Sequence, residues 1–223
     1  MVFLDYSAKR IEPPRVIRAR GLYLRGGKRL LDLAICFALL PIVVPVIFIL
    51  WLLAAATGHT GFFAHLRVGK NGKVFRCWKI RTMVADADGA LNRLFHVRPE
   101  AKVEWSKSRK LENDPRIIPL GHILRRSSLD ELPQIWNVIK GDMSLVGPRP
   151  VTRVELRRYG SDLHHYLATR PGVTGLWQIT DRQSGCYVRR VVLDKHYVQT
   201  ITFAGDLGIL IGTLPALFRL TGR

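Results

Sequence analysis

Two adjacent carboxylates, Asp130 and Glu131, lie in the densest polar stretch of the sequence, RRSSLDELPQ. Pro133 follows them closely, and proline is favoured in the first turn of a helix, where backbone N–H groups have no acceptor. We therefore predict that a helix running to Lys140 begins near Asp130. Both carboxylates would then lie at the positive end of the helix dipole, which stabilises their ionised forms and also attracts phosphate oxygens. Spacing alone leaves a second interpretation open, in which Ser128 and Glu131 form a capping box and Asp130 is a surface acid.

Arginines near this acidic pair favour phosphate chemistry. Arg125 and Arg126 lie one turn upstream, and Arg149 is fixed between Pro148 and Pro150. A carboxylate can attack a phosphoryl group only if the negative charge of both partners is neutralised locally, and arginines and Mg²⁺ commonly supply that neutralisation. The pattern thus indicates phosphoryl transfer with a carboxylate nucleophile, although paired arginines are also common on solvated surfaces.

An apolar segment must place this chemistry near a membrane. Leu33 to Thr57 contains no charged residue and is long enough to span a bilayer as a helix. Basic residues flank both of its ends: Arg15, Arg18, Arg20, Arg25, Lys28 and Arg29 before it, and Arg67, Lys70, Lys73, Arg76, Lys79 and Arg81 after it. The positive-inside rule asks for both flanks in the cytoplasm, and Pro41 and Pro45 can kink the helix. We predict a re-entrant helix over residues 28–57 that bends near Pro45, with a single membrane span as the alternative.

The charge balance also points to an anionic partner. The chain has 35 Lys and Arg against 17 Asp and Glu, a net charge of +18. Because the apolar segment is present, we expect that partner to be membrane lipid and expect no nucleic acid. Residues 1–27 are predicted to form a basic arm on anionic lipid. Three cysteines without metal-ligand spacing suggest a reduced, cytoplasmic setting.

The remaining residues, 58–223, are predicted to form a catalytic domain at the membrane surface. The run from Lys73 to Met83 is rich in β-branched and aromatic residues, which indicates a strand or a strand pair. Two sets with helical spacing indicate short amphipathic helices: Leu120, Ile123 and Leu124, and Leu132, Ile135, Trp136 and Ile139. The apolar run from Leu207 to Phe218 is too short to span. The expected fold class is α+β and mostly helical, with a re-entrant membrane helix hairpin and a small cytoplasmic catalytic domain with short strands.

Several long strings of the sequence resemble one family. They are KRLLDLAICF with Pro45, FRCWKIRTM, NDPRIIPLGHILRRSSLDELPQIWNVIKGDMSLVGPRP and RPGVTGLWQI. These strings are similar to those of the bacterial sugar transferase family, the monotopic phosphoglycosyl transferases that start exopolysaccharide and glycoconjugate assembly. The resemblance covers Lys28 to about Leu217, and small exopolysaccharide-initiating members look most similar.

The resemblance implies a two-step reaction on the cytoplasmic face of the bacterial inner membrane. Asp130 would attack the β-phosphate of a UDP-sugar, release UMP and retain a covalent phosphosugar. Polyprenyl (undecaprenyl) phosphate would then take up the sugar phosphate, with Glu131 positioning or deprotonating this acceptor. Covalent catalysis by a carboxylate is an established route for phosphoryl groups. The expected donor is a UDP-hexose, with glucose or galactose first.

The resemblance also assigns binding residues. Lys79, Arg125 and Arg149 would contact the donor phosphates, and Mg²⁺ would lie beside Asp130. The full predicted binding set is Lys79, Arg81, Thr82, Arg125, Pro148, Arg149, Pro150 and Arg182. Two departures from the family pattern concern the membrane bend and the sugar: Val44 replaces a serine before Pro45, and Thr180 and Asp181 precede Arg182 where serine and glycine are usual.

Two other functions compete with this interpretation. Asp86, Ala87 and Asp88 form an Asp-x-Asp string, which in conventional glycosyltransferases holds a metal-bound nucleotide sugar, and such an enzyme would release UDP. A membrane-bound scaffold that recruits partners through its basic face would release no nucleotide. The oligomeric state is open from sequence, with a homodimer as one alternative.

Overall fold

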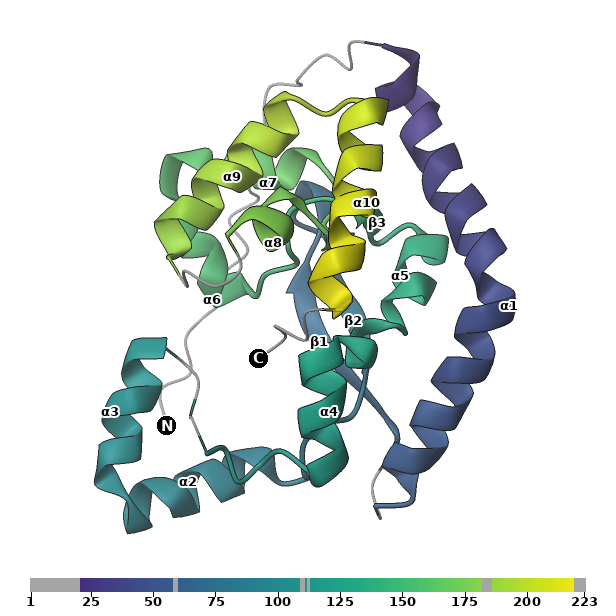
Figure 1. The fold of residues 1–223 in the computed structure, drawn as a ribbon. Coiled ribbons are helices and arrows are strands. Elements are labelled where there is room, and N and C mark those ends of the chain that lie inside the picture. Colours follow the sequence, from purple (N-terminus) through teal and green to yellow (C-terminus); the bar gives the residue numbers. More distant parts are fainter. Residues whose placement is uncertain (1–20, 58–59, 109–110, 112, 182–185, 219–223) are drawn as a thin grey trace.

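The computed structural model describes residues 21–57, 60–108, 111, 113–181 and 186–218. Its described part is mostly helical, with two small two-stranded sheets, so the predicted α+β class is confirmed (Figure 1). A π-helical turn, η1 (Tyr23–Gly27), leads into the long helix α1 (Lys28–Ala55), which runs along one side of the molecule. Within the described residues, this is the one helix that is long and apolar enough to cross a membrane.

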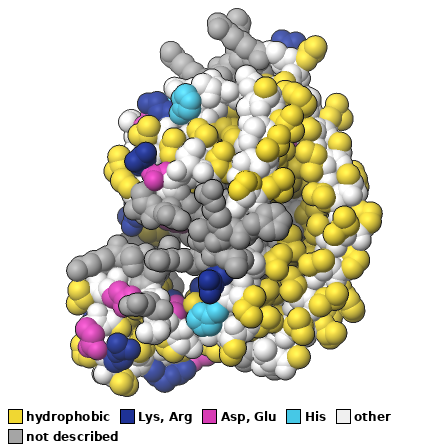
Figure 2. Space-filling model, viewed as in Figure 1, with side chains coloured by type: hydrophobic (Ala, Val, Ile, Leu, Met, Phe, Trp, Pro, Cys, Tyr) yellow, Lys and Arg dark blue, Asp and Glu magenta, His cyan; other side chains and the backbone are white. Residues whose placement is uncertain are grey.

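Helix α1 continues through Pro41 and Pro45 as a single helix. Many of its apolar side chains face outward, among them Phe37, Ile42 and Phe48, each more than half exposed. Figure 2 shows hydrophobic side chains spread along the side of the molecule where α1 and α10 lie. An outward face of this kind suits a lipid environment, while a return of the helix to its entry face stays a prediction.

Both ends of α1 pack on the same globular part. Near its start, Cys36 is fully buried in a cluster with Phe75, Cys77, Val138 and Met143. Near its end, Leu50 and Ala54 are buried against Ile80 and Leu124. Polar contacts add to the first of these interfaces, because Lys28 forms an ion pair with Asp206 and Asp32 accepts hydrogen bonds from the Ser144 hydroxyl and the Leu145 N–H.

An antiparallel hairpin follows α1. Strand β1 (Phe62–Val68) pairs with β2 (Val74–Ile80) through a tight turn, η2 (Lys70–Gly72). The run from Lys73 to Met83 therefore supplies one strand, β2, as the first of its two predicted alternatives had it, and the partner strand β1 comes from residues before that run. Helices α2 (Ala87–Val97) and α3 (Pro99–Ser108) then form an arm that extends away from the hairpin (Figure 1).

The chain returns from this arm through an isolated bridge between Met83 and Ile117 and enters α4 (Pro119–Ser127). A single 3₁₀ turn, η3 (Leu129–Glu131), connects α4 to α5 (Gln134–Lys140). Both predicted amphipathic helices are therefore present. The predicted start of the second helix at Asp130 was wrong, because α5 begins only at Gln134. Pro133 has no N–H to donate, and Ile135 and Trp136 donate to residues three positions back rather than four, which keeps this entry tight.

Two short parallel strands, β3 (Ser144–Val146) and β4 (Gly172–Thr174), join the GDMSLVGPRP and RPGVTG strings. Their approach requires glycine, since a Cβ on Gly172 would lie 2.1 Å from the Gly147 nitrogen, and one on Gly175 would lie 2.2 Å from the Gly147 carbonyl oxygen. Close contact between these backbones explains why Gly147, Gly172 and Gly175 are glycines.

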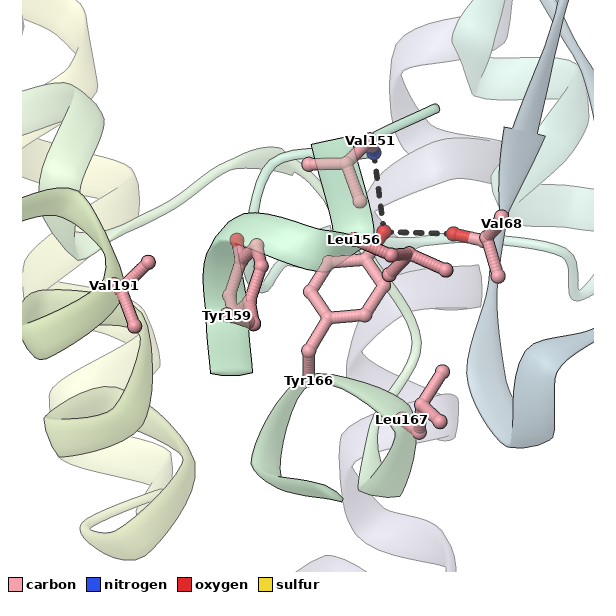
Figure 3. Packing of buried hydrophobic residues seen from close by; sticks show 7 residues of the cluster. All are labelled: Val68, Val151, Leu156, Tyr159, Tyr166, Leu167 and Val191. Atoms are coloured by element: carbon pink, nitrogen blue, oxygen red, sulfur yellow. Dashed lines mark hydrogen bonds between the residues drawn. The ribbon is translucent and has the colours of Figure 1, made fainter. Parts of the chain in front are cut away.

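The C-terminal half is a set of helices packed around this small sheet. They are α6 (Arg153–Leu156), η4 (Arg157–Asp162), α7 (Leu163–Ala168), α8 (Leu176–Thr180), α9 (Tyr187–Gln199) and α10 (Phe203–Phe218). In the cluster of Figure 3, the Tyr166 hydroxyl donates to the Val68 carbonyl and accepts from the Val151 N–H. This one side chain ties the end of β1 to the segment that follows Pro150.

Candidate active site

The turn that carries Asp130 has an unusual backbone. Ser128, which precedes it, has φ 59°, a left-handed conformation that is uncommon for a residue other than glycine. This residue ends α4 and redirects the chain into η3. Ser128 makes no side-chain capping bond at this turn, so the predicted capping box with Glu131 is not formed. Asp130 itself is only 7% exposed, which excludes the alternative of a surface acid.

Strand β2 brings a cation to this turn. The Lys79 ammonium lies 2.6 Å from the nearer carboxylate oxygen of Glu131 and 3.7 Å from that of Asp130. Its side chain is about a quarter exposed, as is that of Glu131. The structure thus brings the predicted phosphate-binding lysine, Lys79, to the predicted nucleophile and its acidic neighbour, although Lys79 and Glu131 are 52 positions apart in the sequence.

The pKa of Asp130 is raised above its ordinary value. Burial is the largest cause, and the negative charge of Glu131 adds to it, while Lys79 and Arg125 act in the opposite direction. The sequence predicted a carboxylate kept ionised by a helix dipole. Instead, the buried position of Asp130 in η3 opposes ionisation, and the neighbouring cations offset part of that effect.

Arg125 is a second cation that acts on the charge of Asp130. Its Nε donates to the Thr82 hydroxyl at 2.9 Å, so two predicted binding residues are joined directly. Burial lowers the pKa of Arg125, whereas the negative charges of Asp130 and Asp114 raise it. Arg125 stays cationic in this setting because its reference pKa is so high. Behind it, Asp114 and Arg116 form a buried ion pair with contacts of 2.8 and 2.6 Å.

Arg149 is presented by a rigid loop. Pro148 and Pro150 are buried, whereas Arg149 is exposed between them. Arg190 of α9 donates to the Arg149 carbonyl at 3.1 Å and holds this backbone in place. Burial raises the pKa of the Cys77 thiol to about 11, and the positive charges of both Lys79 and Arg149 act against that rise. Arg149 thus adds positive charge near Cys77 of β2, two residues before Lys79.

Two members of the predicted set are placed differently. Arg81 donates to the Thr60 carbonyl at 2.8 Å and lies 5.6 Å from the centre of the Phe63 ring, so these contacts are with β1 and the segment before it. Arg182 lies outside the described residues. Of the two unusual residues before it, Asp181 forms an ion pair with Arg189 of α9, and the Thr180 hydroxyl donates to the Leu176 carbonyl.

The Asp-x-Asp string has a structural role. Asp86 is the N-cap of α2, where its carboxylate accepts from the Gly89 N–H and contacts Arg93. Asp86 and Asp88 are both exposed on the arm. Among the described residues, no group of three or more His, Cys, Asp or Glu side chains could hold a metal ion, at this string or elsewhere.

One important residue of the site was not found by sequence reasoning. Asn137 of α5 is 1% exposed, and its amide accepts from the Trp78 N–H at 3.0 Å and donates to the Arg76 carbonyl at 2.8 Å. It pairs with the edge of β2 as a neighbouring strand would, which fixes η3 and α5 beside Lys79. The signal that could have identified it is an amide within the apolar periodicity of a short helix.

Comparisons with known proteins agree on one family. The chain matches the family described as bacterial sugar transferase over residues 23–220. It is 44% identical over 195 residues to the undecaprenyl-phosphate galactose phosphotransferase of Salmonella typhimurium and 40% identical over 195 residues to the UDP-galactose-lipid carrier transferase of Erwinia amylovora. It is also 44% identical over 195 residues to the exopolysaccharide production protein ExoY of Sinorhizobium fredii.

These relatives differ in length. The matched region covers 87% of this chain but only 41% of the Salmonella and Erwinia proteins, so the chain spans about two fifths of their length. With the Sinorhizobium protein it covers 86% of both chains. The family match includes the turn of Asp130, the hairpin that carries Lys79 and the loop of Arg149, and on this basis the chain belongs to the bacterial sugar transferase family.

Proposed function

We propose that this protein transfers a hexose-1-phosphate from a UDP-sugar to a polyprenyl phosphate through a covalent intermediate on Asp130. The observation that carries the proposal is a carboxylate only 7% exposed, held in a strained turn with the Lys79 ammonium 3.7 Å away. A buried carboxylate beside cations suits attack on an anionic phosphoryl group, because the cations neutralise the charge that would otherwise repel it. The names of the Salmonella and Erwinia relatives support the same substrate classes.

The reaction has two displacements at one phosphorus atom. In the first, an Asp130 oxygen bonds to the β-phosphorus, and the bond from that phosphorus to the oxygen bridging to the α-phosphate breaks, so UMP leaves. In the second, a phosphate oxygen of the polyprenyl acceptor bonds to the same phosphorus and the Asp130 carboxylate leaves. Lys79 and Arg125 offset negative charge in both steps, and Glu131 positions or deprotonates the acceptor phosphate.

Mg²⁺ fits this site only in part. Asp130 and Glu131 supply two adjacent carboxylates, and Mg²⁺ is commonly held by one or two carboxylates together with substrate phosphates. A donor diphosphate would have to complete the coordination, with Asp130 as the protein ligand. When bound, such an ion would neutralise diphosphate charge.

The location belongs to the same proposal. Residues 28–57 enter the cytoplasmic face of the bacterial inner membrane and return to it, and residues 58–223 form the catalytic domain at that surface. Most of the predicted basic arm over residues 1–27, namely residues 1–20, lies outside the described residues. Contacts of both ends of α1 with one globular part support this arrangement. Homodimer formation is not needed for the reaction as proposed.

Trapping the intermediate tests the mechanism. Purified full-length protein is incubated without acceptor with UDP-galactose, UDP-glucose and their N-acetylated analogues, and peptides are examined by mass spectrometry. We expect a hexose-phosphate on Asp130 with one donor, equimolar UMP, and no adduct in Asp130→Asn. Glu131→Gln is the matched control, which should still form the adduct but transfer it slowly. The absence of an adduct with every donor, or release of UDP in place of UMP, would overturn the proposal.

Accessibility of single cysteines tests the membrane arrangement. Cysteine is introduced at Ala34, Pro45 or Ala54 in intact cells and labelled with a membrane-impermeant maleimide. A re-entrant helix leaves all three positions protected from the periplasmic side. Periplasmic labelling at Ala54 would instead establish a single span.

A further inference from the structure

The hairpin and α5 form a concave surface whose lining includes none of the residues grouped around Asp130. It is a groove of about 680 Å³ between the hairpin and α5. Its lining consists of Leu66, Lys73, Val74, Phe75, Arg76, Trp78, Trp136, Lys140 and Asp142. None of these residues belongs to the predicted donor-binding set.

The lining combines apolar rings with cations. Trp136 and Leu66 are each 60% exposed. Lys73, Arg76 and Lys140 contribute three positive charges, against one acid, Asp142, which lies 3.5 Å from Lys140. A surface with exposed apolar area and a net positive charge is complementary to an amphiphilic anion.

The groove also lies beside the start of the apolar helix. Arg29 of α1 donates to the carbonyls of Val138 and Ile139, the two residues before Lys140. The charge-free segment begins at Leu33, one turn after Arg29. The cationic end of the groove is thus at the level where α1 enters the apolar phase. Tryptophan and basic residues gather at that level in membrane proteins, and anionic lipids attract basic residues there.

We propose that this groove binds an anionic phospholipid of the surrounding bilayer. Its phosphate would pair with Lys73, Arg76 and Lys140, and its glycerol and upper acyl chain would lie on Trp136. The polyprenyl phosphate acceptor is also an amphiphilic anion, but its phosphate must reach Asp130. Side chains alternate along β2, so Lys79, which contacts Glu131, points to the face opposite Arg76. The groove therefore holds a lipid that supports the protein and does not react.

Lipid retention tests this site without any sugar donor, so its outcome is independent of the proposed reaction. Full-length protein in neutral detergent is titrated with phosphatidylglycerol or with phosphatidylcholine of the same acyl chains, and bound lipid is counted by native mass spectrometry. The test variant is Lys73→Gln with Arg76→Gln. The matched control is Arg98→Gln with Lys102→Gln, which removes the same charge from the exposed arm.

We expect the protein to retain phosphatidylglycerol in preference to phosphatidylcholine, and the control variant to do the same. The affinity of the test variant for phosphatidylglycerol should fall about 30-fold, because each of its two lost basic residues contributes about 1 kcal/mol. Trp136→Ala should weaken retention of both lipids. Protection of the buried Cys77 thiol from maleimide verifies that each variant is folded. Equal losses in the two charge variants would overturn the proposal, as would displacement by glycerol 1-phosphate. Displacement by polyprenyl phosphate in preference to phosphatidylglycerol would assign the groove to the acceptor and also overturn it.

Discussion

Asp130 is subject to two opposing influences. Burial in η3 favours its protonated form, and the charges of Lys79 and Arg125 favour its carboxylate form. Because we propose Asp130 as the nucleophile, we expect activity to depend on these cations, which favour the ionised form that the attack requires.

The pH dependence of adduct formation should show this link. Because the pKa of Asp130 is raised, the rate should begin to fall at a higher pH than an ordinary aspartate would give, as protonation removes the nucleophile. Lys79→Met should move this acidic limb to still higher pH and slow the reaction at neutral pH by about 10²–10³-fold. Single-turnover adduct formation measures both. Lys102→Met on the exposed arm is the control, and an equal shift there would contradict the assignment.

Loss of the Asp130 carboxylate should raise the stability of the protein, although it should abolish the proposed reaction. The folded-state pKa of Asp130 exceeds the unfolded value, so folding favours the neutral form, and this acid lowers stability at any pH above both values. We expect Asp130→Asn to stabilise the protein by about 0.5–2 kcal/mol at pH 7 and to lose that effect near pH 4. Thermal unfolding in detergent at the two pH values measures the difference. Glu131→Gln should not stabilise, because Glu131 makes the closer contact with Lys79.

At the scale of elements, the site depends on how α5 is attached to β2. Asn137 supplies two hydrogen bonds to the strand, on either side of Cys77. Through them the helix that follows Asp130 and the strand that carries Lys79 become one unit. Removing the amide should change the geometry of the site without touching any reacting group.

Asn137→Leu should destabilise the protein by about 2–4 kcal/mol, because it leaves one buried N–H and one buried carbonyl of β2 without a partner. Adduct formation should slow in parallel at temperatures where the protein is still folded. Denaturant unfolding and the single-turnover rate test this. Asn92→Leu on the exposed arm is the control, and the idea fails if the two variants behave alike.

The contact between β3 and β4 should tolerate no side chain. Gly172→Ala places a methyl group 2.1 Å from the Gly147 nitrogen, so the loop of Arg149 must shift. We expect a loss of about 3 kcal/mol or more and weaker donor binding. Gly208→Ala is a suitable control, because its Cβ meets no atom within 4 Å and alanine favours a helix. Unfolding curves of Gly172→Ala and Gly208→Ala measure the difference in their stability.

Local patterns predicted these elements well, and their contacts less so. Strand β2, both amphipathic helices and the length of α1 follow from periodicity and composition, whereas the partner strand β1 was not predicted. The start of α5 could not be predicted in this way, because the left-handed backbone of Ser128 and the 3₁₀ turn after it depend on packing rather than on Pro133 alone. Asn137 and the Asp114–Arg116 pair were missed for a related reason. Their partners are backbone groups or nearby charges whose burial becomes visible only in the folded chain.

At the scale of the whole molecule, α1 is held by polar contacts at one end and by packing at the other. Asp206 of α10 is the centre of the polar end, where it contacts Lys28 and accepts from the hydroxyls of Tyr23 and Tyr197. Asp206 is 1% exposed, so a partner lost here leaves a buried charge. The position of the membrane helix relative to the site thus depends on the C-terminal helix.

Asp206→Leu should loosen α1 by stranding the Lys28 ammonium, at a cost of about 3–5 kcal/mol. The double variant Lys28→Met with Asp206→Leu should be less destabilised than Asp206→Leu alone. Cys36 reports on this interface, since its thiol is fully buried between α1 and the globular part. In a Cys186→Ser background, its rate of maleimide labelling should rise most in Asp206→Leu, and unchanged labelling would refute the role of this ion pair.

The ion pair between Lys28 and Asp206 joins residues that are 178 positions apart. During synthesis, α1 leaves the ribosome early, whereas its carboxylate partner is made only when α10 begins. For most of translation α1 can therefore form its contacts with the hairpin, α4 and α5, but not this ion pair. A chain truncated before α10 would keep that packing and would leave the Lys28 ammonium without its buried carboxylate partner.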